Sequence, residues 1–79
     1  MKINIQYFAK FKEKTGKSNE TFNTDSVNLS ALYNELDKKY NFAMHKNLIR
    51  AAVNEEFCDW EKELNDNDTV VFIQPVAGG

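Results

Sequence analysis

The strongest strand signal in the chain is Thr69-Val70-Val71-Phe72-Ile73-Gln74, a run made mostly of β-branched and aromatic residues. Such a run is typical of a central strand that is buried on both faces of a sheet. Pro75 follows directly, and because proline has no N–H to donate, strand pairing is expected to end there. Asn65-Asp66-Asn67-Asp68 precedes the run and predicts a turn, since Asn and Asp accept left-handed backbone conformations.

Working back along the chain, the hydrophobic pattern predicts one long helix over residues 29–40. Its apolar residues recur at helical spacing and form one stripe: Leu29, Leu32, Tyr33, Leu36 and Tyr40. Asn28 is placed to cap the N-terminus of this helix, and Asn41 is placed to end it. We therefore expect the stripe to face the core.

The N-terminal part predicts two strands joined by a helical turn. In the first strand, three apolar residues alternate with polar ones: Ile3, Ile5 and Tyr7. This alternation is the period of a half-buried strand. Residues 9–15 predict a short helix that ends at Gly16, where a left-handed residue is needed. Residues 20–24 predict a second strand, antiparallel to the first.

Three further signals follow the long helix and complete the fold class. Residues 50–54 predict a strand, Glu55-Glu56 a turn, and residues 57–60 a brief second strand. With the final strand, the order is β-β-α-β-β-β. This order predicts an α+β domain, in which one main helix packs across a mixed sheet.

Composition limits the possible functions. At 79 residues the chain has room for a single domain with one modest core. Its formal net charge is −2, and no basic stripe is present, so nucleic acid is not an expected partner. No apolar run is long enough for a signal peptide or a membrane span, so we expect a cytoplasmic protein without a membrane partner.

The residues that usually form metal or nucleophile sites are sparse. Cys58 and His45 are the only cysteine and histidine, so neither an internal disulfide nor a histidine-based metal cluster is expected. Glu56, Asp59 and Glu61 surround Cys58 and disfavour a thiolate, so we interpret this cysteine as structural. Seven acidic residues lie between residues 55 and 68. They are interpreted first as a solvated surface and second as a means of steering a basic partner.

The last four residues form a slender tail, Val76-Ala77-Gly78-Gly79. Without Cβ atoms, Gly78 and Gly79 let the main chain pass through a narrow channel and bring the terminal carboxyl to a reactive centre. That carboxylate is a poor acyl donor, so it must first be activated, for example by adenylation. The alternative is a chain end without function.

Three segments resemble the small, sulfur-carrying subunit of molybdopterin synthase, the MoaD family. The most specific is the C-terminal segment from Val70 to Gly79. Tyr7-Phe8-Ala9, with Glu13 and Gly16 after it, and Ala51-Ala52-Val53-Asn54 match other family landmarks at corresponding intervals. The resemblance therefore covers nearly the whole chain.

The sequence departs from the family pattern at two positions. Gln74 stands where the family usually has a second proline, which is expected to loosen the exit of the tail without changing its chemistry. Asn67 replaces a glycine that is common in the preceding turn. This exchange is mild because Asn also accepts a positive φ.

The resemblance implies a ubiquitin-like β-grasp fold for residues 1–79, with residues 76–79 as an extended tail. It implies that Gly79 is adenylated with ATP by an E1-like enzyme and converted to a thiocarboxylate with sulfur from a desulfurase system. The tail from Pro75 onward would then thread into the large catalytic subunit of molybdopterin synthase, in a heterotetramer, and donate sulfur to cyclic pyranopterin monophosphate. The chain would be the non-catalytic subunit of this transferase, with no cofactor bound to itself.

Strand parity adds an expected docking surface beside the tail. If Ile3, Ile5 and Tyr7 face the helix, an apolar patch is predicted on the other side of the sheet: Phe8, Phe57, Val71 and Ile73. Contact of this patch with a partner protein is the functional interpretation, and cover by a loop is the structural one.

Three other functions stay open. A sulfur carrier for thiamine thiazole synthesis shares the Gly-Gly end, although it typically lacks the longer middle region. A ubiquitin-like modifier would be joined through the same end to lysines of target proteins. A plain β-grasp binding module would have no tail chemistry and would tolerate loss of Gly79.

Overall fold

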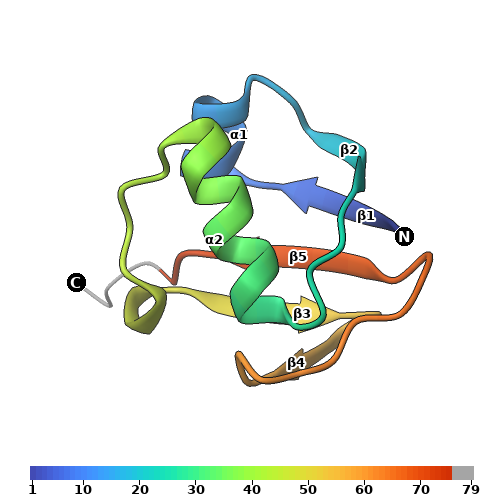
Figure 1. The fold of residues 1–79 in the computed structure, drawn as a ribbon. Coiled ribbons are helices and arrows are strands. Elements are labelled where there is room, and N and C mark those ends of the chain that lie inside the picture. Colours follow the sequence, from blue (N-terminus) through green and yellow to red (C-terminus); the bar gives the residue numbers. More distant parts are fainter. Residues whose placement is uncertain (76–79) are drawn as a thin grey trace.

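The structure, a computed structural model, describes residues 1–75 and consists of a five-stranded sheet with one main helix packed across it (Figure 1). The sheet order is β2-β1-β5-β3-β4. In chain order, the elements are β1 (Lys2–Tyr7), α1 (Ala9–Thr15), β2 (Asn19–Asn23), α2 (Leu29–Tyr40), the 3-10 helix η1 (Lys46–Leu48), β3 (Arg50–Val53), β4 (Glu56–Cys58) and β5 (Thr69–Ile73). The predicted α+β class and the order of the strands are confirmed.

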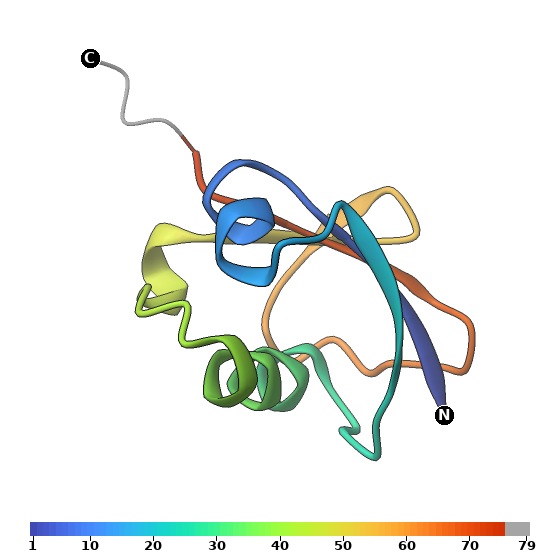
Figure 2. The ribbon, with the colours of Figure 1, turned by 90° about the horizontal axis from the view of Figure 1, so that it is seen from above.

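β5 lies at the centre of the sheet, parallel to β1 and antiparallel to β3. Its central position was predicted, but its expected burial on both faces is wrong. Val70 and Phe72 are fully buried under α2, whereas Val71 and Ile73 on the opposite face are only half-buried. The reason is that α2 covers one face of the sheet, and among residues 1–75 no helix crosses the other face (Figure 2). We call this second face the open face.

The core fills the space between α2 and the sheet. Leu29, Leu32, Tyr33 and Leu36 are buried as predicted, and Tyr40, the last residue of the stripe, is partly buried. The core also contains a tight aromatic cluster, whose members are Tyr7, Phe11, Tyr33, Phe42 and Phe72. Aromatic rings contribute large buried areas, so this cluster supplies much of the stability of a short chain.

Local capping explains where the helices begin and end. The Asn28 side chain accepts a hydrogen bond from the backbone N–H of Ala31 (2.8 Å), as expected of an N-cap. Asn41 ends α2 in the left-handed region with a φ of 54°. Gly16 ends α1 with a φ of 73°, a conformation that costs glycine little because it has no Cβ.

Two predicted boundaries in the β3–β4 region need correction. The turn is centred on Asn54-Glu55, one residue before the predicted Glu55-Glu56, because both residues have positive φ (52° and 72°) as a two-residue hairpin turn requires. β4 ends at Cys58, two residues before the predicted end, because Asp59 accepts backbone hydrogen bonds from Glu61 and Lys62 and turns the chain.

No helix in the described part of the chain has the length and apolar character needed to cross a membrane.

Candidate functional site

The predicted tail follows β5, the last strand of the sheet. β5 ends at Ile73, and Gln74 and Pro75 continue as exposed backbone outside any strand. Since Pro75 cannot donate to a neighbouring strand, the pairing of β5 with β1 and β3 cannot extend through it. The predicted tail residues Val76, Ala77, Gly78 and Gly79 lie outside the described residues.

The four residues of the predicted docking surface lie together on the open face, and we call them the open-face patch: Phe8, Phe57, Val71 and Ile73. Val71 pairs with Ala52, and Ala52 pairs with Phe57, so these three side chains form one row across the sheet. Ile73 and Phe8 belong to the next row, nearer to the exit of the tail. Phe8 is 55% exposed and Phe57 57% exposed, so no loop of the described residues covers them.

The conformation of the β1–α1 junction keeps Phe8 on the open face. Phe8 is extended (φ −127°, ψ 156°) and therefore points away from the face on which Tyr7 is buried. Ala9 then turns the chain with a φ of 49°, which is unfavourable for a residue with a Cβ. After this turn, Phe11 enters the core and anchors α1. The backbone is therefore strained at a junction that leaves the Phe8 ring exposed to solvent.

The β3–β4 hairpin holds Phe57 at the other side of the patch. Arg50, on β3, places its guanidinium carbon 4.4 Å from the centroid of the Phe57 ring. Arg50 was not among the residues predicted for this surface. The alternation of side chains along β3 indicates its position. Ala51 and Val53 face the core, so Arg50 and Ala52 face outward.

Beside the patch, a polar cluster fastens the hairpin to the start of β5. The side chain of Asn54 donates to Asp68 (2.9 Å) and accepts from the backbone N–H of Thr69 (2.9 Å). Asp68 also accepts from the backbone N–H of Asn65 (2.7 Å) and is 92% buried, with 8% of its surface exposed. The interpretation of the acidic residues as a solvated surface is therefore wrong for Asp68, because this carboxylate closes the turn before β5.

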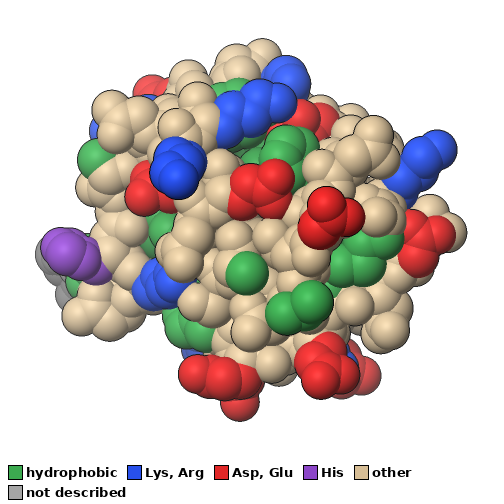
Figure 3. Space-filling view, viewed as in Figure 1, with side chains coloured by type: hydrophobic (Ala, Val, Ile, Leu, Met, Phe, Trp, Pro, Cys, Tyr) green, Lys and Arg blue, Asp and Glu red, His purple; other side chains and the backbone are tan. Residues whose placement is uncertain are grey.

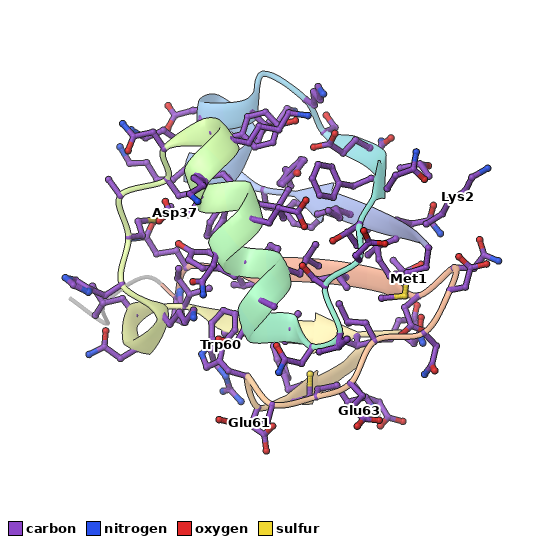
Figure 4. The ribbon with its side chains drawn as sticks, in the orientation of Figure 1. Met1, Lys2, Asp37, Trp60, Glu61 and Glu63 are labelled. Carbon is purple, nitrogen blue, oxygen red and sulfur yellow. The ribbon has the colours of Figure 1, made fainter. Side chains whose placement is uncertain are left out.

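Other acidic residues of the segment do face solvent. Glu61 and Glu63 project from the edge of the molecule beyond β4 (Figure 4), and acidic side chains gather along that edge (Figure 3). Their proposed role in steering a basic partner stays a prediction.

Cys58 has the properties expected of a structural cysteine. It is partly buried and packs against the core. Burial raises the pKa of its thiol, while Lys62 lowers that pKa and Asp59 raises it. The predicted direction of the shift is confirmed. Of the three acids named from the sequence, Asp59 and Glu56 contribute to it, but burial is the largest cause. Within residues 1–75, no three side chains of the metal-binding types come together as a metal site.

A charged network closes the covered side of the sheet. Glu20 of β2 accepts hydrogen bonds from the hydroxyls of Tyr7 (2.5 Å) and Tyr40 (2.7 Å) and from the Lys17 ammonium (3.2 Å). Burial alone would raise the pKa of Glu20, but these hydrogen bonds outweigh it and leave the pKa lowered. Burial and the hydrogen bond to Glu20 raise the pKa of Tyr7. This network ties β1, β2 and α2 together on the covered face of the sheet.

Comparison with known families identifies the chain. A model of the ThiS family matches residues 5–79, almost the entire sequence. The chain belongs to the ThiS family. The resemblance drawn from the sequence is thereby confirmed at the level of this group of ubiquitin-like sulfur carriers.

Solved structures agree with this ThiS-family assignment. A putative molybdopterin converting factor subunit 1 from Pyrococcus furiosus has 26% identity and a TM-score of 0.82, over 96% of this chain and 99% of that chain. SAMP1 from Haloferax volcanii has 16% identity and a TM-score of 0.81, with both chains fully covered. In the complex of subunits 1 and 2 of molybdopterin-converting factor from Helicobacter pylori 26695, the matched chain has 22% identity and a TM-score of 0.70, again with both chains fully covered. No curated protein matches the chain by sequence. These likenesses establish the β-grasp fold of the ThiS-family chain.

Proposed function

We propose that this protein is the sulfur-carrier subunit of a molybdopterin synthase and that Gly79 carries the sulfur. An E1-like enzyme joins the Gly79 carboxylate to AMP from ATP and releases pyrophosphate. A persulfide supplied by a desulfurase system then attacks the acyl-adenylate and displaces AMP. A second thiol reduces the resulting acyl disulfide and leaves a thiocarboxylate. The thiocarboxylate sulfur then attacks cyclic pyranopterin monophosphate. Water hydrolyses the resulting thioester, so the sulfur stays on the pterin and Gly79 returns to a carboxylate. The acid–base residues of that transfer belong to the large subunit.

The observation that carries the proposal is the position of the open-face patch beside the end of β5 in a chain whose ThiS-family match runs through Gly79. A carrier must bind a partner firmly enough to hold its tail in the partner's active site. A patch that contains two exposed phenyl rings is suited to that task, because aromatic residues dominate the energetics of protein interfaces. Pro75 ends the sheet pairing and separates this rigid surface from the tail that follows.

The choice of pathway is supported by two structural relatives. The Pyrococcus furiosus protein is named for molybdopterin conversion, and the Helicobacter pylori chain was solved with its subunit 2. SAMP1, the small archaeal modifier protein 1, has the same fold at lower identity, and the modifier function is therefore the alternative to test.

The test begins with co-production of the chain with an E1-like enzyme and a desulfurase. Intact-mass spectrometry is expected to show that one oxygen of the Gly79 carboxyl is replaced by sulfur. The modified chain, mixed with a large subunit and cyclic pyranopterin monophosphate, should then yield molybdopterin. A variant with one extra residue after Gly79 serves as the control and should yield none.

The alternatives give different results in the same experiment. Thiazole formation with a thiazole synthase, and no molybdopterin, would assign the carrier to thiamine synthesis. Gly-Gly remnants on lysines of cellular proteins would assign it as a modifier. Molybdopterin synthesis by the extended variant would refute the role of Gly79.

A further inference from the structure

One cation lies within the open-face patch. Arg50 pairs with Ile73 in the β3–β5 ladder, and directly paired residues place their side chains on the same face. Its guanidinium carbon lies 4.4 Å from the centroid of the Phe57 ring, so the charge lies against the exposed aromatic ring of β4. Any protein that covers this surface must therefore also cover Arg50.

Arg50 differs from two cations on the helix-covered side, Lys17 and Lys46, whose ammonium groups have polar side-chain partners. There, Lys17 is paired with Glu20, and the Lys46 ammonium, which lies over Trp60, donates to the Ser30 hydroxyl. Within residues 1–75 the ion pairs join Lys10 with Glu13 and Lys17 with Glu20, and neither includes Arg50. Among the described residues, its guanidinium lies over the Phe57 ring and its side chain is exposed to solvent, where a charge costs little.

That arrangement becomes unfavourable when a partner displaces the water. A buried charge without an opposite charge is strongly destabilising, whereas a guanidinium that meets a carboxylate forms two parallel, charge-assisted hydrogen bonds. The Phe57 ring holds the guanidinium on the surface before contact, so less side-chain freedom is lost on binding. A surface that is apolar around a single fixed cation is complementary to an apolar surface with one carboxylate.

We infer that Arg50 determines partner specificity, because proteins that dock on the open-face patch must present a carboxylate to its guanidinium. The inference rests on the proposed function only in requiring that the carrier docks on its E1-like enzyme and its large subunit. It adds that a protein with a matching apolar surface but no carboxylate at this point is rejected, since binding would strand the charge of Arg50.

The experiment measures dissociation constants of the full-length chain with the E1-like enzyme and with the large subunit by calorimetry. Arg50→Gln is expected to weaken binding by about 30-fold or more, the range for truncating one partner of a buried, hydrogen-bonded ion pair. Arg50→Lys should recover only part of the affinity, because an ammonium cannot form the bidentate pair. Lys2→Gln is the matched control: Lys2 has open-face parity but lies at the far end of β1, so its loss should leave affinity unchanged.

A double-mutant cycle identifies the carboxylate. Each Asp and Glu on the partner's docking surface is changed to Ala in turn, and one of these variants should bind the wild-type chain and the Arg50→Gln chain with equal affinity. Thermal unfolding checks that the Arg50 variants are folded, as expected for an exposed side chain.

The possible failures are distinct. Equal binding of wild type and Arg50→Gln, or a loss that couples to no partner carboxylate, would overturn this inference and leave the proposed function standing. A wild-type chain that binds neither protein would overturn both. A chain that binds through Arg50 but never acquires a thiocarboxylate would retain the docking surface and refute the sulfur chemistry.

Discussion

The two faces of the sheet are built from the same strands but have different tasks. On the face covered by α2, Ile3, Ile5 and Phe72 are completely buried. On the open face, their sequence neighbours Asn4, Val71 and Ile73 are half-buried. Phe8 and Phe57, on the same face, are exposed. Burial of apolar area is the main source of stability, so the covered face stabilises the fold. The open face contributes little to folding and is free to bind a partner.

This difference between the covered face and the open face explains how a chain of 79 residues supports both a core and a candidate interface. A short domain buries a limited fraction of its surface, and most of its aromatic residues are needed inside. Here five aromatic rings cluster under α2, while two phenyl rings are left outside. These two rings lie beside Val71 and Ile73, and an exposed apolar patch of this kind marks a candidate interaction site.

The largest effect is expected from neighbouring truncations on opposite faces of β5. Phe72→Ala should lower the free energy of unfolding by about 3–5 kcal/mol, because it leaves a cavity among the rings of Phe11, Tyr33 and Trp60. Ile73→Ala should lower it by about 1 kcal/mol, since a half-buried side chain loses less apolar contact. Urea denaturation of both variants measures the difference.

A second substitution guards against loss of the fold. If Phe72→Ala is too unstable to measure, Phe72→Leu should still be destabilised more than Ile73→Ala, because it also removes ring contacts. Equal destabilisation by the substitutions at Phe72 and Ile73 would contradict the division of tasks between the two faces.

Strand parity made most of this division predictable. The alternation of Ile3, Ile5 and Tyr7 assigned the covered face of β1, and the position of Phe8 assigned the open one. In β5 residues 70–73 are all apolar, so this run alone predicted burial on both faces, whereas the predicted docking surface placed Val71 and Ile73 on the open side. Which face of β5 is covered depends on the position of α2, which packs across one face of the sheet. Burial of β5 on both faces was therefore predicted and is wrong.

The Glu20 network is expected to give an intermediate, pH-dependent effect on the covered side. At neutral pH, Glu20→Gln should lower the free energy of unfolding by about 1–2 kcal/mol, since the carboxylate accepts hydrogen bonds from Tyr7, Tyr40 and Lys17. The pKa of Glu20 is lowered in the folded protein. Its contribution is therefore complete above the unfolded-state pKa of about 4.3, and it is lost as the pH falls through the lower folded-state pKa.

Denaturation at pH 7 and at about pH 3 tests this directly. The stability difference between wild type and Glu20→Gln should shrink in acid. Glu13→Gln, an exposed position on α1 whose contact with Lys10 is long (3.9 Å), is the control and should differ little from wild type at either pH. A Glu20→Gln difference that stays constant with pH would show that the carboxylate charge does not stabilise the fold.

Long-range contacts account for what the sequence could not predict. Glu20 meets Tyr40 across twenty residues, and Phe42 enters the core from a segment without helical or strand periodicity. In the sequence, Asp68 does not differ from the other acidic residues of its segment. Its burial follows from contacts with Asn54 and Asn65 that only the structure shows. Local pattern defines elements, but which polar residues are buried follows from how these elements meet. The tail was predicted from its small residues after Pro75 and from the family resemblance, and its role stays a prediction until the sulfur-transfer test.

The smallest effect is expected at Ala9, where the open face imposes a cost on the backbone. A φ of 49° is unfavourable for alanine and free of strain for glycine, although glycine also gives the unfolded chain more freedom. Ala9→Gly should therefore raise the free energy of unfolding by at most about 1 kcal/mol. Lys10→Gly, inside α1 with ordinary helical geometry, should instead lower it by about 1 kcal/mol. Because the gain at Ala9 comes from relief of strain at the residue after Phe8, partner affinity should remain at the wild-type value while stability rises. A fall in stability at Ala9 comparable to that at Lys10 would mean that presenting Phe8 costs the fold nothing.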